Sequence, residues 1–131
     1  MKRTFAVVAL VLLATVALTL HAQDAAKSST ISGTLVDLKC YAAAGLTTND
    51  HGSMKGCGAA CASGGLPVAL LDANKAVHML AVSAPAYASY VGMEVRFTGA
   101  HGKNADVFIP DKLEVKEGDK WVEKKLPKTM M

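Results

Sequence analysis

The sequence has few aromatic residues and lacks the motifs that usually accompany catalysis. Aromatic side chains make up 5% of its 131 residues, with a single tryptophan. It contains no paired carboxylates, no Ser/His/Asp arrangement and no glycine-rich phosphate loop with lysine at a useful spacing. It also lacks the C-x-x-C-H sequence for haem attachment, because Ala62 follows Cys61. These absences favour a binding or structural protein over an enzyme, with a thiol oxidoreductase as the open exception.

Long apolar runs are also scarce, and the one that exists lies at the N-terminus. The basic start Met1-Lys2-Arg3 precedes an apolar run from Phe5 to Leu20, and the small residue Ala22 comes before a polar segment. This is the pattern of a secretory signal peptide, and the run is short for a membrane span of about 30 Å. We expect a signal peptide over residues 1–22, cleavage after Ala22, and a periplasmic or secreted protein that meets the membrane only before cleavage. The alternative is an uncleaved anchor.

Excess charge of either sign is missing as well. The whole chain carries a formal net charge of +3. Removal of Lys2 and Arg3 with the leader leaves 12 basic against 11 acidic residues, a net charge of +1. A nucleic-acid-binding protein would be expected to show a basic stripe interleaved with aromatic residues. We therefore expect no nucleic-acid partner, and the sequence indicates no particular protein partner.

Alternating apolar residues predict a single all-β domain with one short helix. After a flexible lead-in over residues 23–30, strands are expected at 31–38, 68–71, 76–82, 94–98 and 105–116, with a possible return strand at Trp121 and Val122. Ser83 and Gly92 bracket the expected helix, residues 42–55 form a long loop, and residues 124–131 form a frayed tail. A helix between the third and fourth of five strands predicts an OB-like Greek-key barrel over residues 31–123. A small β-sandwich or roll is the alternative.

All three cysteines lie in or beside the expected long loop. Cys40 follows the first expected strand, His51 lies in the loop, and Cys57 and Cys61 are one helical turn apart. Three thiols and an imidazole are a common ligand set for tetrahedral zinc, and the same sulfur atoms suit Cu(I). The pattern therefore predicts a site for zinc or copper formed by Cys40, His51, Cys57 and Cys61, in which Asp37 could support His51 as an outer-shell partner.

Two other interpretations of the cysteines remain open. A disulfide from Cys40 to Cys57 or Cys61 would close a loop of about 17 to 21 residues and stabilise the domain by about 3 kcal/mol. The protein would then be a disulfide-stapled interaction module of the cell envelope with one spare thiol. A thiol redox protein is the third possibility, and it would require a cysteine of depressed pKa. His78 and His101 are expected to have no role in the site.

The same residues carry a resemblance to a family. The segment from Gly33 to Tyr41, the loop histidine and the C-x-x-x-C sequence of Cys57 and Cys61 resemble small exported bacterial proteins of unknown function. The resemblance covers about residues 31–115 and includes the strand from Val95 to Gly99. It implies an OB-like barrel with a Cys/His cluster, and it implies no activity. The charged segment over residues 116–128 departs from the family pattern.

Overall fold

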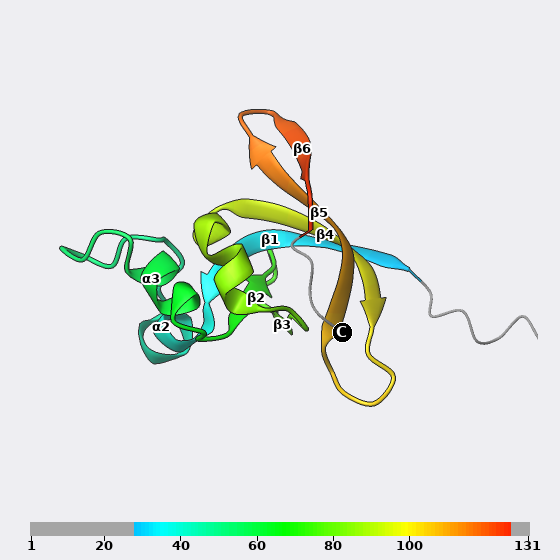
Figure 1. Ribbon diagram of the computed structural model, residues 1–131, viewed down its shortest axis with the longest axis horizontal. Helices are drawn as coiled ribbons and strands as arrows, with labels where there is room; N and C mark the ends of the chain where they lie inside the picture. The colour runs from blue at the N-terminus through cyan, green and yellow to red at the C-terminus, as the bar shows by residue number, and fades with distance from the viewer. Residues whose placement is uncertain (1–27, 127–131) are drawn as a thin grey trace, which may run out of the picture.

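The computed structural model describes residues 28–126, and within them the protein is mostly β, as the sequence predicted. One antiparallel sheet of six strands has the order β3-β2-β1-β4-β5-β6. Figure 1 shows this sheet strongly twisted, with α2 and α3 gathered at one end and the β5–β6 hairpin projecting away from them. The strands are β1 Ser29–Asp37, β2 Val68–Leu71, β3 Val77–Met79, β4 Glu94–His101, β5 Phe108–Glu117 and β6 Lys120–Lys124.

The helices differ from the prediction of one short helix. The described residues contain two α-helices, α2 Leu38–Ala44 and α3 Cys57–Ser63, and one 3-10 helix, η1 Ala84–Tyr90. Only η1 matches the predicted helix: Ser83 is its N-cap and a proline lies in its first turn. The predicted long loop is shorter than expected because α2 takes up its first residues and α3 follows at its end.

The ends of the domain also differ from the expected boundaries. β1 begins at Ser29, inside the segment expected to be a lead-in, and β6 makes a full sixth strand against β5. Lys124, expected in the tail, belongs to β6. The predicted signal peptide and the last five residues lie outside the described residues. Within residues 28–126 no helix has the length and apolar character needed to cross a membrane.

The sheet bends back toward itself along a seam between β3 and β5. Just after β3, Leu80 forms a parallel bridge with Phe108 at the start of β5. Its hydrogen bond runs from the Ala81 amide to the Phe108 carbonyl at 2.9 Å. On the other side of β5, the β4–β5 pairing shifts register between Thr98 and Gly99. A bulge of this kind bends a strand and increases its twist, so it supports the curvature that brings β5 back toward β3.

The core lies on the concave side of the sheet and is covered by η1. Tyr87 of η1 is buried and its ring lies 6.0 Å from that of Phe97 on β4. Strand residues of the same face alternate with more exposed neighbours, as the period of two requires. The core face of the sheet includes Leu35, Leu70, Val95, Phe97, Leu113 and Val115. This core fixes the end of β1, from which the cysteine-bearing helices start.

Candidate metal centre

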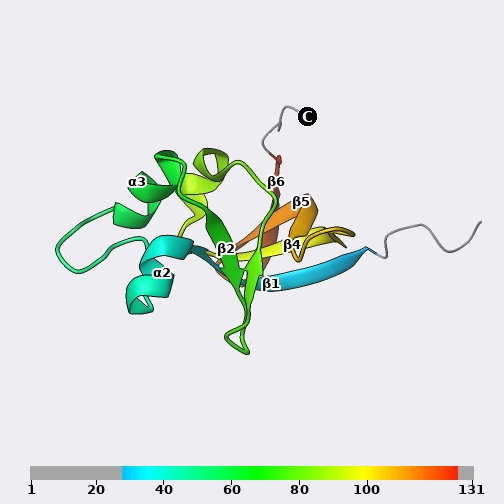
Figure 2. The ribbon, with the colours of Figure 1, turned by 90° about the horizontal axis from the view of Figure 1, so that it is seen from below.

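The structure brings the three cysteines together at one end of the sheet. The Sγ atoms of Cys40, Cys57 and Cys61 all lie within 4.8 Å of one another. All three side chains are free thiols and half-buried. α2 supplies the first and α3 the other two, and these helices lie at the same end of the molecule in both views (Figures 1 and 2). Among residues 28–126, no other group of three or more Cys, His, Asp or Glu side chains has its ligand atoms within 4.8 Å of one another.

Helix α2 places Cys40 directly beyond the end of β1. Asp37, the last residue of β1, caps the helix: its Oδ1 accepts a hydrogen bond from the Cys40 amide at 3.0 Å. The helix ends at Gly45, whose left-handed conformation (φ 67°) glycine adopts without strain. An aspartate before the helix and a glycine after it are the usual start and stop signals. Cys40 is therefore held in the first turn of a short capped helix.

Helix α3 places Cys57 and Cys61 on one of its faces. The two residues are one turn apart, and the adjacent face buries Gly58 and Ala62. A Cβ atom at Gly58 would lie only 2.7 Å from the Cγ1 atom of Val91, beside the C-terminal end of η1. The missing side chain lets α3 lie close to the core. The cysteines are then left half-buried at the edge of the core, on the side of α2.

The loop between the helices is fixed by its own polar side chains. The backbone carbonyl of Asn49 accepts a hydrogen bond from the Gly58 amide at 3.0 Å. Its side-chain Oδ1 accepts one from the Ala59 amide at 2.8 Å. Asp50 accepts from the Gly56 amide at 2.7 Å, and this bond holds the pKa of its carboxyl below the ordinary value. Together these contacts satisfy free amides at the start of α3. They anchor the helix that carries two of the three thiols.

His51, predicted as the fourth ligand, is not part of the cysteine group. Its side chain is 6% exposed, and its Nε2 donates to the Thr48 carbonyl at 2.9 Å within the same loop. Its Nδ1 is buried without a hydrogen-bond partner. A backbone contact of this kind is typical of a histidine whose other nitrogen binds a metal. Even so, the ring nitrogens do not lie within 4.8 Å of all three sulfur atoms.

Asp37 lies against the thiols and not beside His51. It is 2% exposed, and its Oδ2 is buried without a hydrogen bond. Contact with the Asp37 carboxylate is the main cause that raises the pKa of the Cys61 thiol to about 12, followed by burial and the neighbouring cysteines. Burial, followed by the charges of Asp37 and Cys57, also raises the pKa of the Cys40 thiol. In the absence of a metal these two thiols therefore stay protonated at neutral pH.

The raised pKa values do not favour the redox interpretation. A redox-active cysteine reacts as the thiolate and typically has a depressed pKa, maintained by a nearby cation or a helix N-terminus. Cys40 and Cys61 instead face a carboxylate and each other. A bound cation would lower these pKa values, since a coordinating thiol is deprotonated outright. The arrangement is better suited to holding a metal ion than to attacking a substrate.

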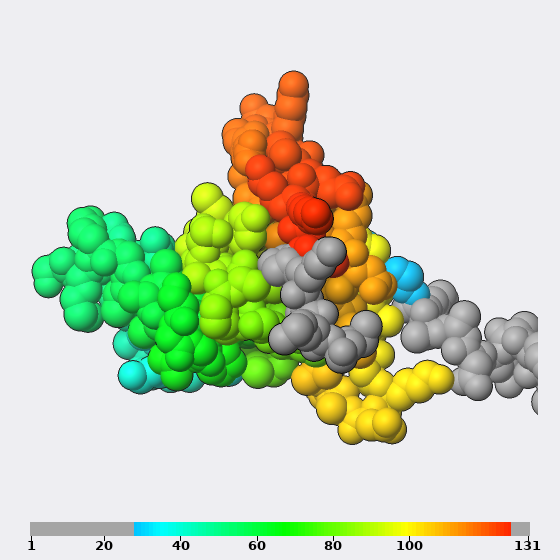
Figure 3. All heavy atoms as spheres, in the orientation of Figure 1, coloured from blue at the N-terminus to red at the C-terminus, as the bar shows by residue number. Residues whose placement is uncertain are grey.

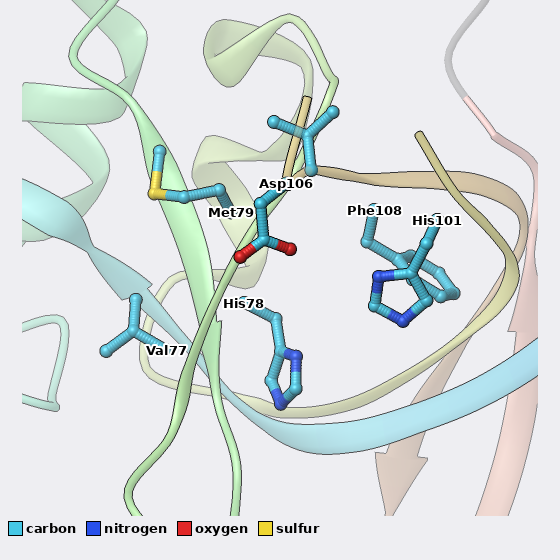
Figure 4. Close-up of a pocket in the computed structure, with 7 residues that line it drawn as sticks. Val77, His78, Met79, His101, Asp106 and Phe108 are labelled. Carbon is cyan, nitrogen blue, oxygen red and sulfur yellow. The ribbon is translucent and has the colours of Figure 1, made fainter. Parts of the chain in front are cut away.

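A second group of polar side chains surrounds a hollow of about 300 Å³ between β3 and the β4–β5 loop. Figure 4 shows His78, His101 and Asp106 around it. His78 is already paired through its Nε2 with Asp72 Oδ2 at 3.1 Å, and the His101 ring contacts Phe108 edge-on. Their donor atoms do not converge as the cysteine sulfurs do. His78 and His101 thus line this hollow and are not part of the cysteine group.

Comparison with protein-family models, with curated proteins and with solved structures gives no match for this chain. The resemblance to small exported bacterial proteins therefore remains a prediction from the sequence.

The contact between Asp37 and Cys61 predicts slow thiol chemistry in the metal-free protein. In a variant with Cys40 and Cys57 both replaced by serine, we expect iodoacetamide to modify Cys61 at pH 8 at least about tenfold more slowly than free cysteine. The Asp37 carboxylate, the largest cause of the raised Cys61 pKa, is still present in this variant, so less thiolate forms at pH 8 and the rate should keep climbing at higher pH than for free cysteine. Replacing Asp37→Asn in the same background should speed the reaction. A rate at pH 8 equal to that of free cysteine would contradict the contact.

Proposed function

We propose that this protein is a small exported binding protein whose Cys40, Cys57 and Cys61 hold one soft or borderline metal ion, zinc or copper. The observation that carries the proposal is the approach of three sulfur atoms to within 4.8 Å of one another. Thiolates are the preferred ligands of Cu(I) and common ligands of Zn²⁺. The half-buried position of the sulfur atoms supports a role in which the ion can be taken up and released.

Export is proposed from the N-terminal sequence. The basic start, the apolar run and Ala22 form a signal-peptide pattern, and this pattern supports a periplasmic or secreted location for the mature protein. An exported thiol site faces an oxidising compartment, and a bound metal protects thiolates there by occupying them. A disulfide between two of the three cysteines is the competing state, because the same proximity permits it.

For the fold we infer an OB-like, partly open barrel formed by β1 to β5. Supporting this are the order β3-β2-β1-β4-β5, the helix η1 between β3 and β4, and the parallel bridge between Leu80 and Phe108. An OB-fold is a five-stranded Greek-key barrel of this partly open kind. β6 extends the sheet beyond it. The fold by itself assigns no ligand.

The direct test is metal content together with a thiol count. The full-length gene is expressed, the protein is purified without chelator, and metal is measured by plasma mass spectrometry. We expect one zinc or copper ion per chain and three thiols that become titratable once the metal is stripped under denaturing conditions. Cys57→Ser should abolish the metal, whereas His78→Ala, which lies at the separate hollow, should retain it. A wild-type chain that carries no metal overturns the proposal, and a single titratable thiol would then identify a disulfide.

A further inference from the structure

The cysteine triad is one donor short of the set that zinc usually takes. Zinc is almost always four-coordinate and tetrahedral in structural sites. The structure gathers three sulfur atoms, and the His51 nitrogens are not among the donors that meet there. A fourth donor would have to move in from a neighbouring side chain, and Asp37, unlike His51, is among the groups that raise the pKa of the Cys40 and Cys61 thiols.

Asp37 has an oxygen with no other partner. Its Oδ1 is engaged by the Cys40 amide at 3.0 Å, but its Oδ2 is buried and accepts no hydrogen bond. Leaving a buried acceptor unpaired is costly, and more so for a charged group. The carboxylate also lies against the thiols of the triad, Cys61 foremost, and contributes to raising the pKa of Cys61 and of Cys40.

We propose that Asp37 Oδ2 is the fourth donor of the triad, which makes the site one for a divalent ion of the zinc class. This deepens the proposed function and depends on it. Zinc accepts carboxylate oxygen at about 2.0 to 2.2 Å, whereas Cu(I) is selected by sulfur and gains little from an oxygen ligand. An additional negative charge beside three thiolates also favours a doubly charged ion over a singly charged one.

Binding requires the donors to move slightly closer together. Sulfur atoms bound at about 2.3 Å in a tetrahedron lie about 3.8 Å apart, so an ion would draw the three inward from their present separation of up to 4.8 Å. The Asp37 oxygens do not lie within 4.8 Å of all three sulfur atoms, so Oδ2 would also have to move toward the ion. Because Asp37 is already fixed through Oδ1, Oδ2 can turn to the ion without loss of the helix cap.

The test compares two metals in the same variants. Affinities of the full-length protein for Zn²⁺ and for Cu(I) are measured by competition with chromophoric chelators, in the wild type and in Asp37→Asn. Asparagine is as good an N-cap as aspartate, so α2 should be kept. Removing the carboxylate also eases ionisation of the thiols, but that effect is common to both metals. The ratio of the two affinities therefore reports the carboxylate as donor and as charge together, and the Co²⁺ spectrum separates the donor from the charge.

We expect the Zn²⁺-to-Cu(I) affinity ratio to fall by about 10- to 100-fold in Asp37→Asn. Asp37→Ser, a second residue that caps helices, should behave alike. The matched control is Asp72→Asn, which removes a carboxylate that accepts the backbone amides of Asn74 and Ala76 away from the triad, and its ratio should stay within about twofold of the wild type. In the Co²⁺-loaded protein, Asp37→Asn should shift the visible ligand-field bands and keep the sulfur-to-metal charge-transfer band.

Failure of this inference is distinguishable from failure of the proposed function. If the wild type binds one equivalent of either metal but Asp37→Asn leaves the affinity ratio and the Co²⁺ spectrum unchanged, Asp37 is not a ligand and the metal-binding proposal survives. If the wild type binds neither metal, the metal-binding proposal and the assignment of Asp37 as a ligand are both wrong.

Discussion

Adding zinc to the metal-free protein is expected to raise its free energy of unfolding by about 4 kcal/mol when the free ion exceeds its dissociation constant a thousandfold. The ion would bind side chains that meet only in the folded chain, since Cys40 lies on α2 and Cys57 and Cys61 lie on α3. A domain of this size has a total stability of about 5 to 15 kcal/mol, so the gain would be a large share of it. Urea unfolding followed by circular dichroism at several buffered zinc concentrations measures the effect.

Removing one sulfur provides the control for this prediction. In Cys57→Ser the unfolding curves with and without zinc should nearly coincide, because two thiols bind the ion far less tightly than three. The metal-free forms of the variant and of the wild type should unfold at similar urea concentrations, since serine is close to cysteine in size and the position is half-buried. Coincident curves for the wild type with and without zinc would contradict metal-linked folding.

The largest effect from a core substitution is expected for Phe97→Ala, a loss of about 3 to 5 kcal/mol in the free energy of unfolding. Phe97 has no exposed surface, and its ring contacts that of Tyr87 on η1. Truncation removes buried apolar area and leaves a cavity between the sheet and the helix that covers it. Chemical denaturation measures the loss, and the population that remains folded should still bind one metal ion, because the triad lies on α2 and α3.

The neighbouring residue on the opposite face of β4 serves as the matched control. Thr98 shares a hydrogen bond of 3.0 Å with Thr30 on the exposed side of the sheet. Thr98→Ala should therefore cost less than about 1 kcal/mol. Equal losses for the two variants would mean that the concave side of the sheet is not the main source of stability.

The sequence was most informative where one local pattern determined the structure. Strict alternation through Val95 and Phe97 predicted a strand at 94–98, which lies within β4, and both side chains are buried. The four-residue spacing of Cys57 and Cys61 predicted that their sulfur atoms could face one way, and α3 places them so. Both predictions depend only on the geometry of a single element.

Neither α2 nor α3 was predicted as an element, although the signals of α2 were present. Asp37 before the helix, a run of three alanines and Gly45 after it are the start and stop signals of α2. The alternation of β1 up to Leu38 favoured a longer strand and a loop instead. The contact of Asp37 with Cys61 depends on how β1, α2 and α3 meet in space, which no local pattern contains. The same is true of the bridge between Leu80 and Phe108.

The register of β1 has a consequence for the quality of any refolded sample. Asp37 stands opposite Val68 in the β1–β2 ladder. Since side chains alternate between the two faces, a slip of one residue would turn Asp37 to the opposite face of the sheet. A misaligned molecule would keep all three cysteines but lose the carboxylate beside them. Zinc affinity therefore distinguishes correctly aligned molecules from misaligned ones that a thiol count alone would score as identical.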